Sequence, residues 1–260
     1  MAWVLSLITR EFSWVDRLWS TAPPVYVLYV AGAAGFGDMR LNLMAAVVTL
    51  WGARLTFNYA RKGGYWKGGE DYRWAVLRGK MSPWQFQLFS ATFIHPFQMG
   101  LVFLFTSPMH EAWVARGTPL TWADGLVATA FLALLAIETI ADEQMWAFQQ
   151  EKKRKIAQGE PVERPFYDRG LYRLSRHPNY FAEVGQWWVF VGFAIVASGS
   201  WLTWTWSGPV VLTILFWGSY RFAEAISLSK YPSYAQYQQT TSAVIPWIPR
   251  AVPPKTRTQG

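Results

Sequence analysis

A dense group of polar side chains lies in the segment RGLYRLSRHPNYFAE, residues 169–183. Arg176 could hold a phosphate through two parallel hydrogen bonds, because a guanidinium group matches the geometry of phosphate oxygens. Asn179 offers both a donor and an acceptor, which a carboxamide ring substituent requires. Pro178 disfavours helix at the residue before it, so we expect a helix to begin after His177. These residue types suit the binding of a phosphate-bearing cofactor.

A second polar group occurs in the segment WGARLTFNYAR. Arg54, Asn58 and Arg61 stand at positions i, i+4 and i+7, so a helix would carry all three on one face. Further along the chain, Glu138 and Asp142 are four residues apart and share a helical face in the same way. Ionisable residues inside apolar helices are costly and are candidates for function. The basic run at 152–155 has a simpler explanation, which is contact with anionic lipid head groups.

Several kinds of chemistry are excluded or disfavoured by what the sequence lacks. The chain has no cysteine, so it holds neither a disulfide nor a thiolate zinc site, and three histidines make an all-histidine metal site improbable. We therefore expect no metal. The sequence contains no GxGxxG motif, P-loop or GxSxG elbow. A nucleotide cofactor must then be bound by polar helix ends and loops.

The elements that position these groups are predicted to be membrane helices. Of the 260 residues, 52% are hydrophobic and 15% charged, against about 25% charged in soluble domains. A bilayer span needs about 20 mostly apolar residues. Six stretches qualify: 20–37, 41–60, 84–107, 122–147, 182–204 and 208–227. The alternative is a soluble helical bundle with a large core, but several of these stretches are too long and too free of charge for burial on one side.

Charge placement predicts the orientation of the chain. Six alternating spans put twenty of the 24 Lys and Arg residues on one side, which the positive-inside rule makes cytoplasmic. We therefore expect an all-α polytopic membrane bundle of six to seven helices, with both termini in the cytoplasm. Residues 1–250 are expected to form one domain, and residues 251–260 a flexible cytoplasmic tail.

With these motifs in view, the sequence resembles the steroid 5α-reductase-like family of membrane proteins, in its uncharacterised branch. The resemblance is carried by GLYRLSRHPNYFAE, by WGARLTFNYARKGGYWKGGEDYRW, by ADEQMWAFQ and by the closing YAQYQQTTSAVIPW, and it covers most of residues 12–250 in order. Its HPNY-x-x-Glu element is shared with sterol C14-type reductases. A looser RHPxY element also occurs in membrane methyltransferases.

The resemblance implies an NADPH-dependent reductase of a carbon–carbon double bond conjugated to a carbonyl. Asn179 and Glu183 match positions that hold the nicotinamide end of the cofactor. Asp16 resembles the glutamate that contacts the substrate carbonyl, and Trp51 stands where the steroid enzymes carry a tyrosine. These two departures put a steroid 3-oxo substrate in doubt. The cofactor-binding residues that the motifs predict are Arg54, Asn58, Arg61, Asp142, Arg169, Arg176, His177, Asn179, Tyr180, Glu183 and Tyr237.

In the expected mechanism NADPH enters from the cytoplasm, and Arg54, Arg61 and Arg176 bind its phosphates. Asn179 and Glu183 fix the nicotinamide face, and Asp16 stabilises the enolate charge, which requires a protonated Asp16. An equal alternative is that Asp16 orients Arg17 or caps a helix. The expected partners are a hydrophobic steroid or lipid enone and the bilayer, without nucleic acid. The membrane is either a bacterial inner membrane or the endoplasmic reticulum.

Two other functions stay open on the sequence. The first is a membrane methyltransferase that uses S-adenosylmethionine, which would leave the face with Arg54, Asn58 and Arg61 without a purpose. The second is a sterol- or lipid-binding protein that has lost turnover, which the tryptophan at position 51 favours and the intact Asn179 and Glu183 oppose.

Overall fold

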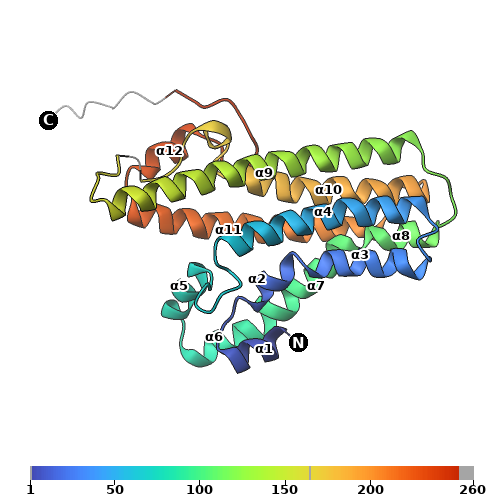
Figure 1. The fold of residues 1–260 in the computed structure, drawn as a ribbon, viewed down its shortest axis with the longest axis horizontal. Coiled ribbons are helices and arrows are strands. Elements are labelled where there is room, and N and C mark those ends of the chain that lie inside the picture. Colours follow the sequence, from blue (N-terminus) through green and yellow to red (C-terminus); the bar gives the residue numbers. More distant parts are fainter. Residues whose placement is uncertain (1, 164, 252–260) are drawn as a thin grey trace. The chain divides into compact units, whose positions relative to one another are not determined.

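A computed structural model describes residues 2–163 and 165–251, and in this part of the chain the regular structure is helical (Figure 1). Two residues, Ser175 and Ser242, form an isolated parallel bridge, and no strand occurs among the described residues. The all-helical fold class is therefore confirmed there. The chain divides into two compact units, 1–133 with 185–214 and 134–184 with 215–260. The predicted tail lies outside the described residues except for Ala251.

The first unit holds the N-terminal helices and a part of each long later helix. Its elements are α1 (Ala2–Thr9), α2 (Trp14–Trp19), α3 (Ala22–Ala33), α4 (Met39–Arg61), α5 (Tyr72–Lys80), α6 (Pro83–Phe89), the π-helix η1 (Ser90–Phe97), α7 (Gln98–Thr106), α8 (Pro108–Val114) and the 3-10 turn η3 (Trp204–Trp206). Helices α3 and α4 pack against each other. Gly52 permits this approach, because a Cβ there would overlap the ring of Pro24 on α3 and would lie 2.6 Å from the Ser20 carbonyl oxygen.

The second unit is built from three long helices and the segments that join them. Helices α9 (Trp122–Ala157), α10 (Pro178–Ser198) and α11 (Ser207–Lys230) each pass from one unit into the other. The unit also contains the 3-10 turn η2 (Gly170–Arg173) and the short helix α12 (Tyr234–Thr240). As the sequence predicts, α10 begins directly after His177, with Pro178 at its first position, where a missing N–H costs nothing.

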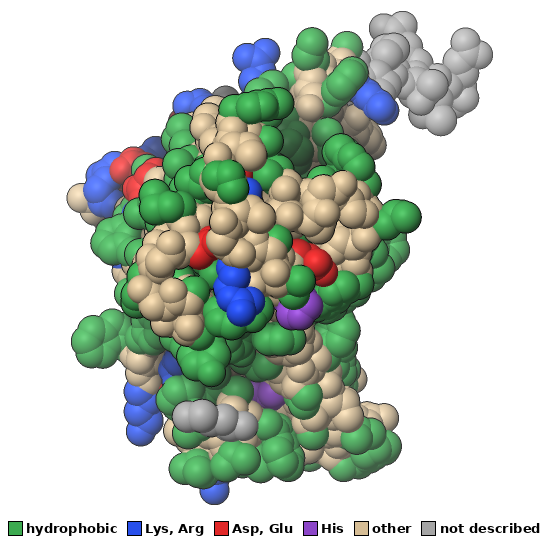
Figure 2. Space-filling model, turned by 90° about the vertical axis from the view of Figure 1, so that its right-hand side faces the viewer, with side chains coloured by type: hydrophobic (Ala, Val, Ile, Leu, Met, Phe, Trp, Pro, Cys, Tyr) green, Lys and Arg blue, Asp and Glu red, His purple; other side chains and the backbone are tan. Residues whose placement is uncertain are grey.

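Three helical stretches are long and apolar enough to cross a membrane: Pro83–Thr106, Trp122–Ala157 and Pro178–Ser198. They correspond to three of the six predicted spans. Helix α4 has 23 residues and α11 has 24, whereas α3 has only 12, about 18 Å of helix. On the face shown in Figure 2, hydrophobic side chains dominate and charged side chains occur in small groups. A membrane protein fits these observations, while the number of spans and the side of each terminus stay predictions.

The first unit contains an aromatic core and a buried ion pair that hold its helices together. The indole of Trp51 is fully buried and packs edge-on against Trp187 at 4.9 Å between ring centroids. Arg40 of α4 reaches Asp124 of α9 with two hydrogen bonds, Nε to Oδ1 at 2.7 Å and Nη2 to Oδ2 at 3.0 Å. Both side chains are at least 98% buried. The bidentate geometry satisfies charges that would otherwise be costly there.

Candidate functional site

The RHPNY segment is anchored in the second unit by an ion pair between Arg176 and Glu224 of α11. Nε of Arg176 donates to Oε1 of Glu224 at 2.7 Å, and Nη2 donates to Oε2 at 3.0 Å. The two side chains are 9% and 7% exposed. Nη1 of Arg176 also donates to the carbonyl oxygens of Gln238 and Thr241. Four of the five guanidinium N–H donors therefore have protein partners, and the predicted phosphate role would require this network to open.

His177 and Gln238 complete the environment of Glu224. Nε2 of His177 lies 2.9 Å from Oε1, and Nε2 of Gln238 donates to Oε2 at 2.8 Å. The imidazole also packs near the rings of Tyr180 and Tyr220. Glu224 of α11 thus binds an arginine and a histidine that precede α10 and the side-chain amide of Gln238 on α12.

Backbone hydrogen bonds dock the C-terminal segment onto the residues that precede α10. The N–H of Arg176 donates to Ser242 at 2.8 Å, and that of His177 to Ala243 at 3.0 Å. In return, the N–H of Trp247 donates to the Leu174 carbonyl at 2.9 Å. This pairing fixes the backbone from which Asn179 and Glu183 start on α10.

An aromatic cluster gathers several of the predicted cofactor residues. The hydroxyl of Tyr237 donates to the carbonyl of Tyr172, and Phe166 stacks on Tyr237 at 5.5 Å between ring centroids. Burial raises the pKa of Tyr172, and the negative charge of Asp142 raises it further. Tyr180 and Tyr237 act on it in the same direction. Tyr237 is thus bonded to Tyr172, and Asp142 and Tyr180 lie within electrostatic reach of it.

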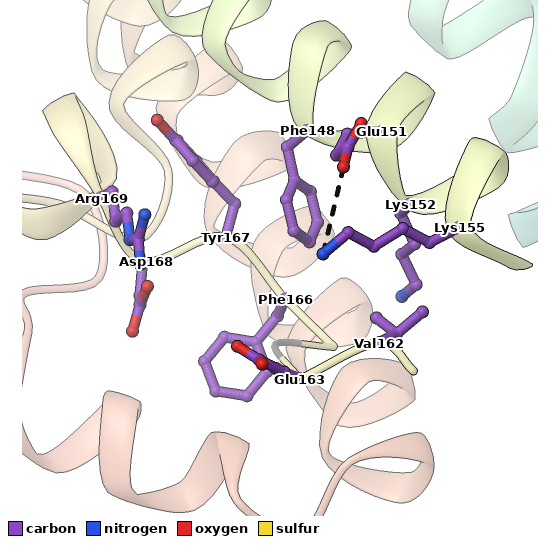
Figure 3. Close-up of a pocket in the computed structure, with 10 residues that line it drawn as sticks. All are labelled: Phe148, Glu151, Lys152, Lys155, Val162, Glu163, Phe166, Tyr167, Asp168 and Arg169. Atoms are coloured by element: carbon purple, nitrogen blue, oxygen red, sulfur yellow. Dashed lines mark ion pairs between the residues drawn. The ribbon is translucent and has the colours of Figure 1, made fainter. Parts of the chain in front are cut away.

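A cavity of about 280 Å³ lies beside this cluster (Figure 3). Its wall combines aromatic rings and cations from the end of α9 and from the segment that follows, and Tyr167 packs on Tyr172 at 5.4 Å. The lining residues are Phe148, Glu151, Lys152, Lys155, Val162, Glu163, Phe166, Tyr167, Asp168 and Arg169. Aromatic rings can stack on a flat base, and nearby cations can bind its phosphates, so this wall suits a nucleotide.

The cations of this cavity differ in how far they are engaged. Nζ of Lys152 donates to the carbonyl of Pro165 at 2.6 Å and to the hydroxyl of Tyr231 at 3.0 Å, so it holds the wall together. Among the described residues, the ion pair of Lys155 is a 4.0 Å contact with Glu151, the dashed line in Figure 3, while Glu151 bonds Arg154 more closely at 2.7 Å. Arg169 is exposed, and no ion pair of its side chain occurs within the described residues. Lys155 and Arg169 are the cations best placed to bind an anion.

The acidic residues that the sequence singles out are buried in the second unit. Glu138 and Asp142 are 4% and 5% exposed on α9, so the predicted shared face is a buried one. Glu183 is 4% exposed in the second turn of α10, and Asn179 is half-buried in the first.

In the first unit, Asp16 lies in the first turn of α2 and accepts a hydrogen bond from the indole Nε1 of Trp74 at 2.8 Å. Burial raises the pKa of Asp16 to about 6, although the Trp74 bond opposes this. Arg17 bonds elsewhere, to Glu11 at 2.6 Å and to the Gly64 carbonyl at 3.1 Å. Among the described residues, Asp16 does not orient Arg17.

The predicted face of α4 also forms in the first unit. Oδ1 of Asn58 accepts hydrogen bonds from Nε and Nη2 of Arg61 at 3.0 and 2.8 Å, and Asn58 is 5% exposed. Arg54 is half-buried on the same helix. Trp51, placed beside the substrate carbonyl by the resemblance, packs in the aromatic core described above. Five of the predicted site residues thus belong to this unit and eight to the other.

Comparison with known proteins assigns a family to this arrangement. The family model described as a protein of unknown function, DUF1295, matches residues 2–241. The chain belongs to this family. An uncharacterised protein of Schizosaccharomyces pombe is 36% identical over 258 residues, which covers 94% of this chain and 75% of the relative. No solved structure matches significantly.

Sequence reasoning missed several residues of this DUF1295 protein. Glu224 is noticeable as a carboxylate inside an apolar stretch, but nothing in the spacing names Arg176 and His177 as its partners. Tyr172 lies within the polar segment 169–183, yet only the fold shows that its carbonyl accepts a hydrogen bond from Tyr237. Lys152, which sequence analysis explained by lipid head groups, turns inward to Pro165 and Tyr231.

Proposed function

We propose that this protein is a membrane-embedded NADPH-dependent reductase that saturates a carbon–carbon double bond conjugated to a carbonyl, as in the steroid 5α-reductase-like family. The observation that carries the proposal is the cavity at the end of α9, where aromatic rings and cations adjoin the cluster of Asp142, Tyr172, Tyr180 and Tyr237. When bound, the cofactor would supply hydride to the β-carbon of the acceptor.

The cavity residues fit the non-reacting half of such a cofactor. Phe148, Phe166 and Tyr167 offer faces on which an adenine ring can stack, and Lys155 and Arg169 offer charge for phosphates. S-adenosylmethionine carries no phosphate and offers these cations only its amino-acid carboxylate, whereas NADPH offers several phosphate groups. We assign Arg176 a positioning role, because its donors are engaged by Glu224 and two carbonyl groups.

In the second unit, the proposal gives Asn179 and Glu183 to the nicotinamide end of the cofactor. Asn179 can donate to and accept from a carboxamide, and buried Glu183 can accept hydrogen bonds in a site from which water is excluded. Asp16 would donate a hydrogen bond or a proton at the substrate carbonyl. A pKa of about 6 keeps roughly a tenth of this carboxyl protonated at pH 7. In this proposal the cofactor site faces the cytoplasm.

NADPH binding to purified variants tests this assignment. Arg169→Ala and Lys155→Ala should each weaken binding about tenfold, because each removes a charge-assisted hydrogen bond. Asn179→Ala should abolish binding. Lys153→Ala, which removes an exposed lysine outside the cavity, is the matched control and should bind as the wild type does. Equal affinity in all four variants would contradict the site.

A further inference from the structure

A second cavity, of about 360 Å³, lies in the first unit among α3, α7, α8 and η3. Its size is at the lower end of ligand pockets, which span roughly 300–1,000 Å³. None of its residues is a predicted cofactor or catalytic residue. The lining residues are Tyr26, Val27, Tyr29, Val30, Ala33, Phe103, Thr106, Ser107, Met109, His110, Trp113 and Trp204.

The rim of this cavity is amphipathic in the way of a membrane interface. Tyr29 is 75% exposed, Phe103 59% and Trp204 51%. Tyrosine and tryptophan gather where lipid tails meet head groups. The ring of Tyr26 packs edge-on against Phe103 at 5.7 Å, and the ring of Trp204 lies 6.0 Å from His110. An opening with such a rim favours an occupant that arrives from the bilayer.

The wall carries one hydroxyl without a protein partner. Ser107, between α7 and α8, is 6% exposed, and its buried Oγ has no hydrogen-bond partner among the described residues. The neighbouring Thr106 is satisfied, since its hydroxyl donates to the Phe103 carbonyl at 2.8 Å. Because buried polar groups are nearly always paired, Ser107 is a vacant hydrogen-bonding position in an apolar wall. Its Oγ lies beneath the wall, so binding a ligand there requires the Ser107 side chain to turn about Cα–Cβ.

The charge of the wall restricts the head group of a ligand. No Lys, Arg, Asp or Glu lines the cavity. The carboxylate of Glu111 lies 3.9 Å from Nδ1 of His110, a lining residue, and would repel an anion. A carboxylate or phosphate head group therefore finds no counter-charge, whereas a neutral hydroxyl finds Ser107 and His110.

From these observations we propose that the cavity binds a neutral, single-headed amphiphile from the bilayer, with its hydrocarbon body among the aromatic residues and its hydroxyl on Ser107. The site is independent of the reductase assignment, because it shares no residue with it. Its ligand class is that of long-chain alcohols, not fatty acids or phospholipids.

Photolabelling in lipid nanodiscs tests this proposal. The probe is hexadecanol with a diazirine in its chain, and the comparison probes are the matching diazirine hydrocarbon and diazirine palmitate. Peptide mapping should place the alcohol's label on α3, α8 or η3, and excess unlabelled hexadecanol should compete. Labelling by the hydrocarbon and by palmitate should be at least fivefold weaker.

Two variants with matched controls distinguish the contribution of the Ser107 hydroxyl from that of the cavity volume. Ser107→Ala should lower labelling by the alcohol about fivefold, as expected for one hydrogen bond, and leave labelling by the hydrocarbon unchanged. Ala33→Trp should fill the cavity and abolish specific labelling by the alcohol. The controls are Ser198→Ala and Thr129→Trp, which lie outside the cavity and should label as the wild type does. Equal labelling by all three probes, or an alcohol signal that survives both test variants, would overturn the proposal.

Discussion

Two buried arginine–carboxylate pairs, one in each unit, have similar geometry but differ in what surrounds them. Arg40 and Asp124 are almost completely enclosed. Arg40 also donates to the Thr118 hydroxyl and the Pro119 carbonyl, and Asp124 also accepts from the N–H and the hydroxyl of Thr121. Arg176 and Glu224 are slightly more exposed and share the carboxylate with a histidine. The first pair joins α4, α9 and the segment that precedes α9. The second lies at the start of α10, where the predicted cofactor residues begin.

The largest effect is expected from breaking the enclosed pair. Arg40→Met leaves Asp124 charged and without its partner, which should cost about 3–5 kcal/mol of stability, measured by thermal unfolding in detergent. The double variant Arg40→Met/Asp124→Leu should recover most of this loss, because it removes both charges. Arg116→Met, an exposed arginine stacked on Trp113, is the control and should change little. A double variant as unstable as the single one would show that the charge is not the cause.

Breaking the second pair should affect both stability and binding. Glu224→Gln removes the charge that balances Arg176, which we expect to cost about 2–3 kcal/mol. NADPH affinity should fall at the same time, because Arg176 positions the residues before α10. Glu160→Gln changes a carboxylate at the surface that lies 3.6 Å from Arg154, and should alter neither quantity. Unchanged NADPH affinity in a destabilised Glu224→Gln protein would reduce this pair to the purely structural role of the first.

The acid in the first unit gives a pH-dependent prediction. The pKa of Asp16 is about 6 in the folded protein against 3.8 ordinarily, so the ionised form costs the folded state up to about 3 kcal/mol. The cost is absent below about pH 3.8 and complete above pH 6. Asp16→Asn keeps an acceptor for Trp74 without the charge. Its melting temperature should exceed that of the wild type at about pH 8, and the difference should vanish as the pH falls below about 4.

A difference in melting temperature that is the same at every pH would contradict the raised pKa. If Asp16 is also the acid in the reaction, the wild-type turnover rate should fall as the pH rises through about 6, and Asp16→Asn should lose this dependence together with most of its activity.

The smallest effect is expected in the aromatic cluster of the second unit, where Tyr237 bonds Tyr172. Tyr237→Phe removes the hydroxyl that donates to the Tyr172 carbonyl and should cost about 1 kcal/mol in a denaturation curve. Tyr29→Phe, at an exposed ring, should cost nothing measurable. A loss of several kcal/mol in Tyr237→Phe would mean that the aromatic cluster depends on this bond more than one hydrogen bond allows.

Local patterns predicted the local parts of this molecule. The helical class, the start of α10 at Pro178 and the shared faces of Asn58 with Arg61 and of Glu138 with Asp142 follow from periodicity and from proline chemistry. The ion pairs do not, because their partners lie 84 and 48 residues apart and no spacing encodes them. The same holds for the cavity at the end of α9, where the basic run 152–155 is easily explained by lipid contact alone.

The most direct test of the reductase assignment is a competition experiment on the purified protein, in which NADH and S-adenosylmethionine compete with bound NADPH. The proposed cavity predicts selective NADPH binding that an equal concentration of either competitor fails to displace, and that weakens about tenfold in Arg169→Ala. Displacement by S-adenosylmethionine would place the protein with the methyltransferases. Failure to bind NADPH would contradict the reductase and favour a lipid-binding protein.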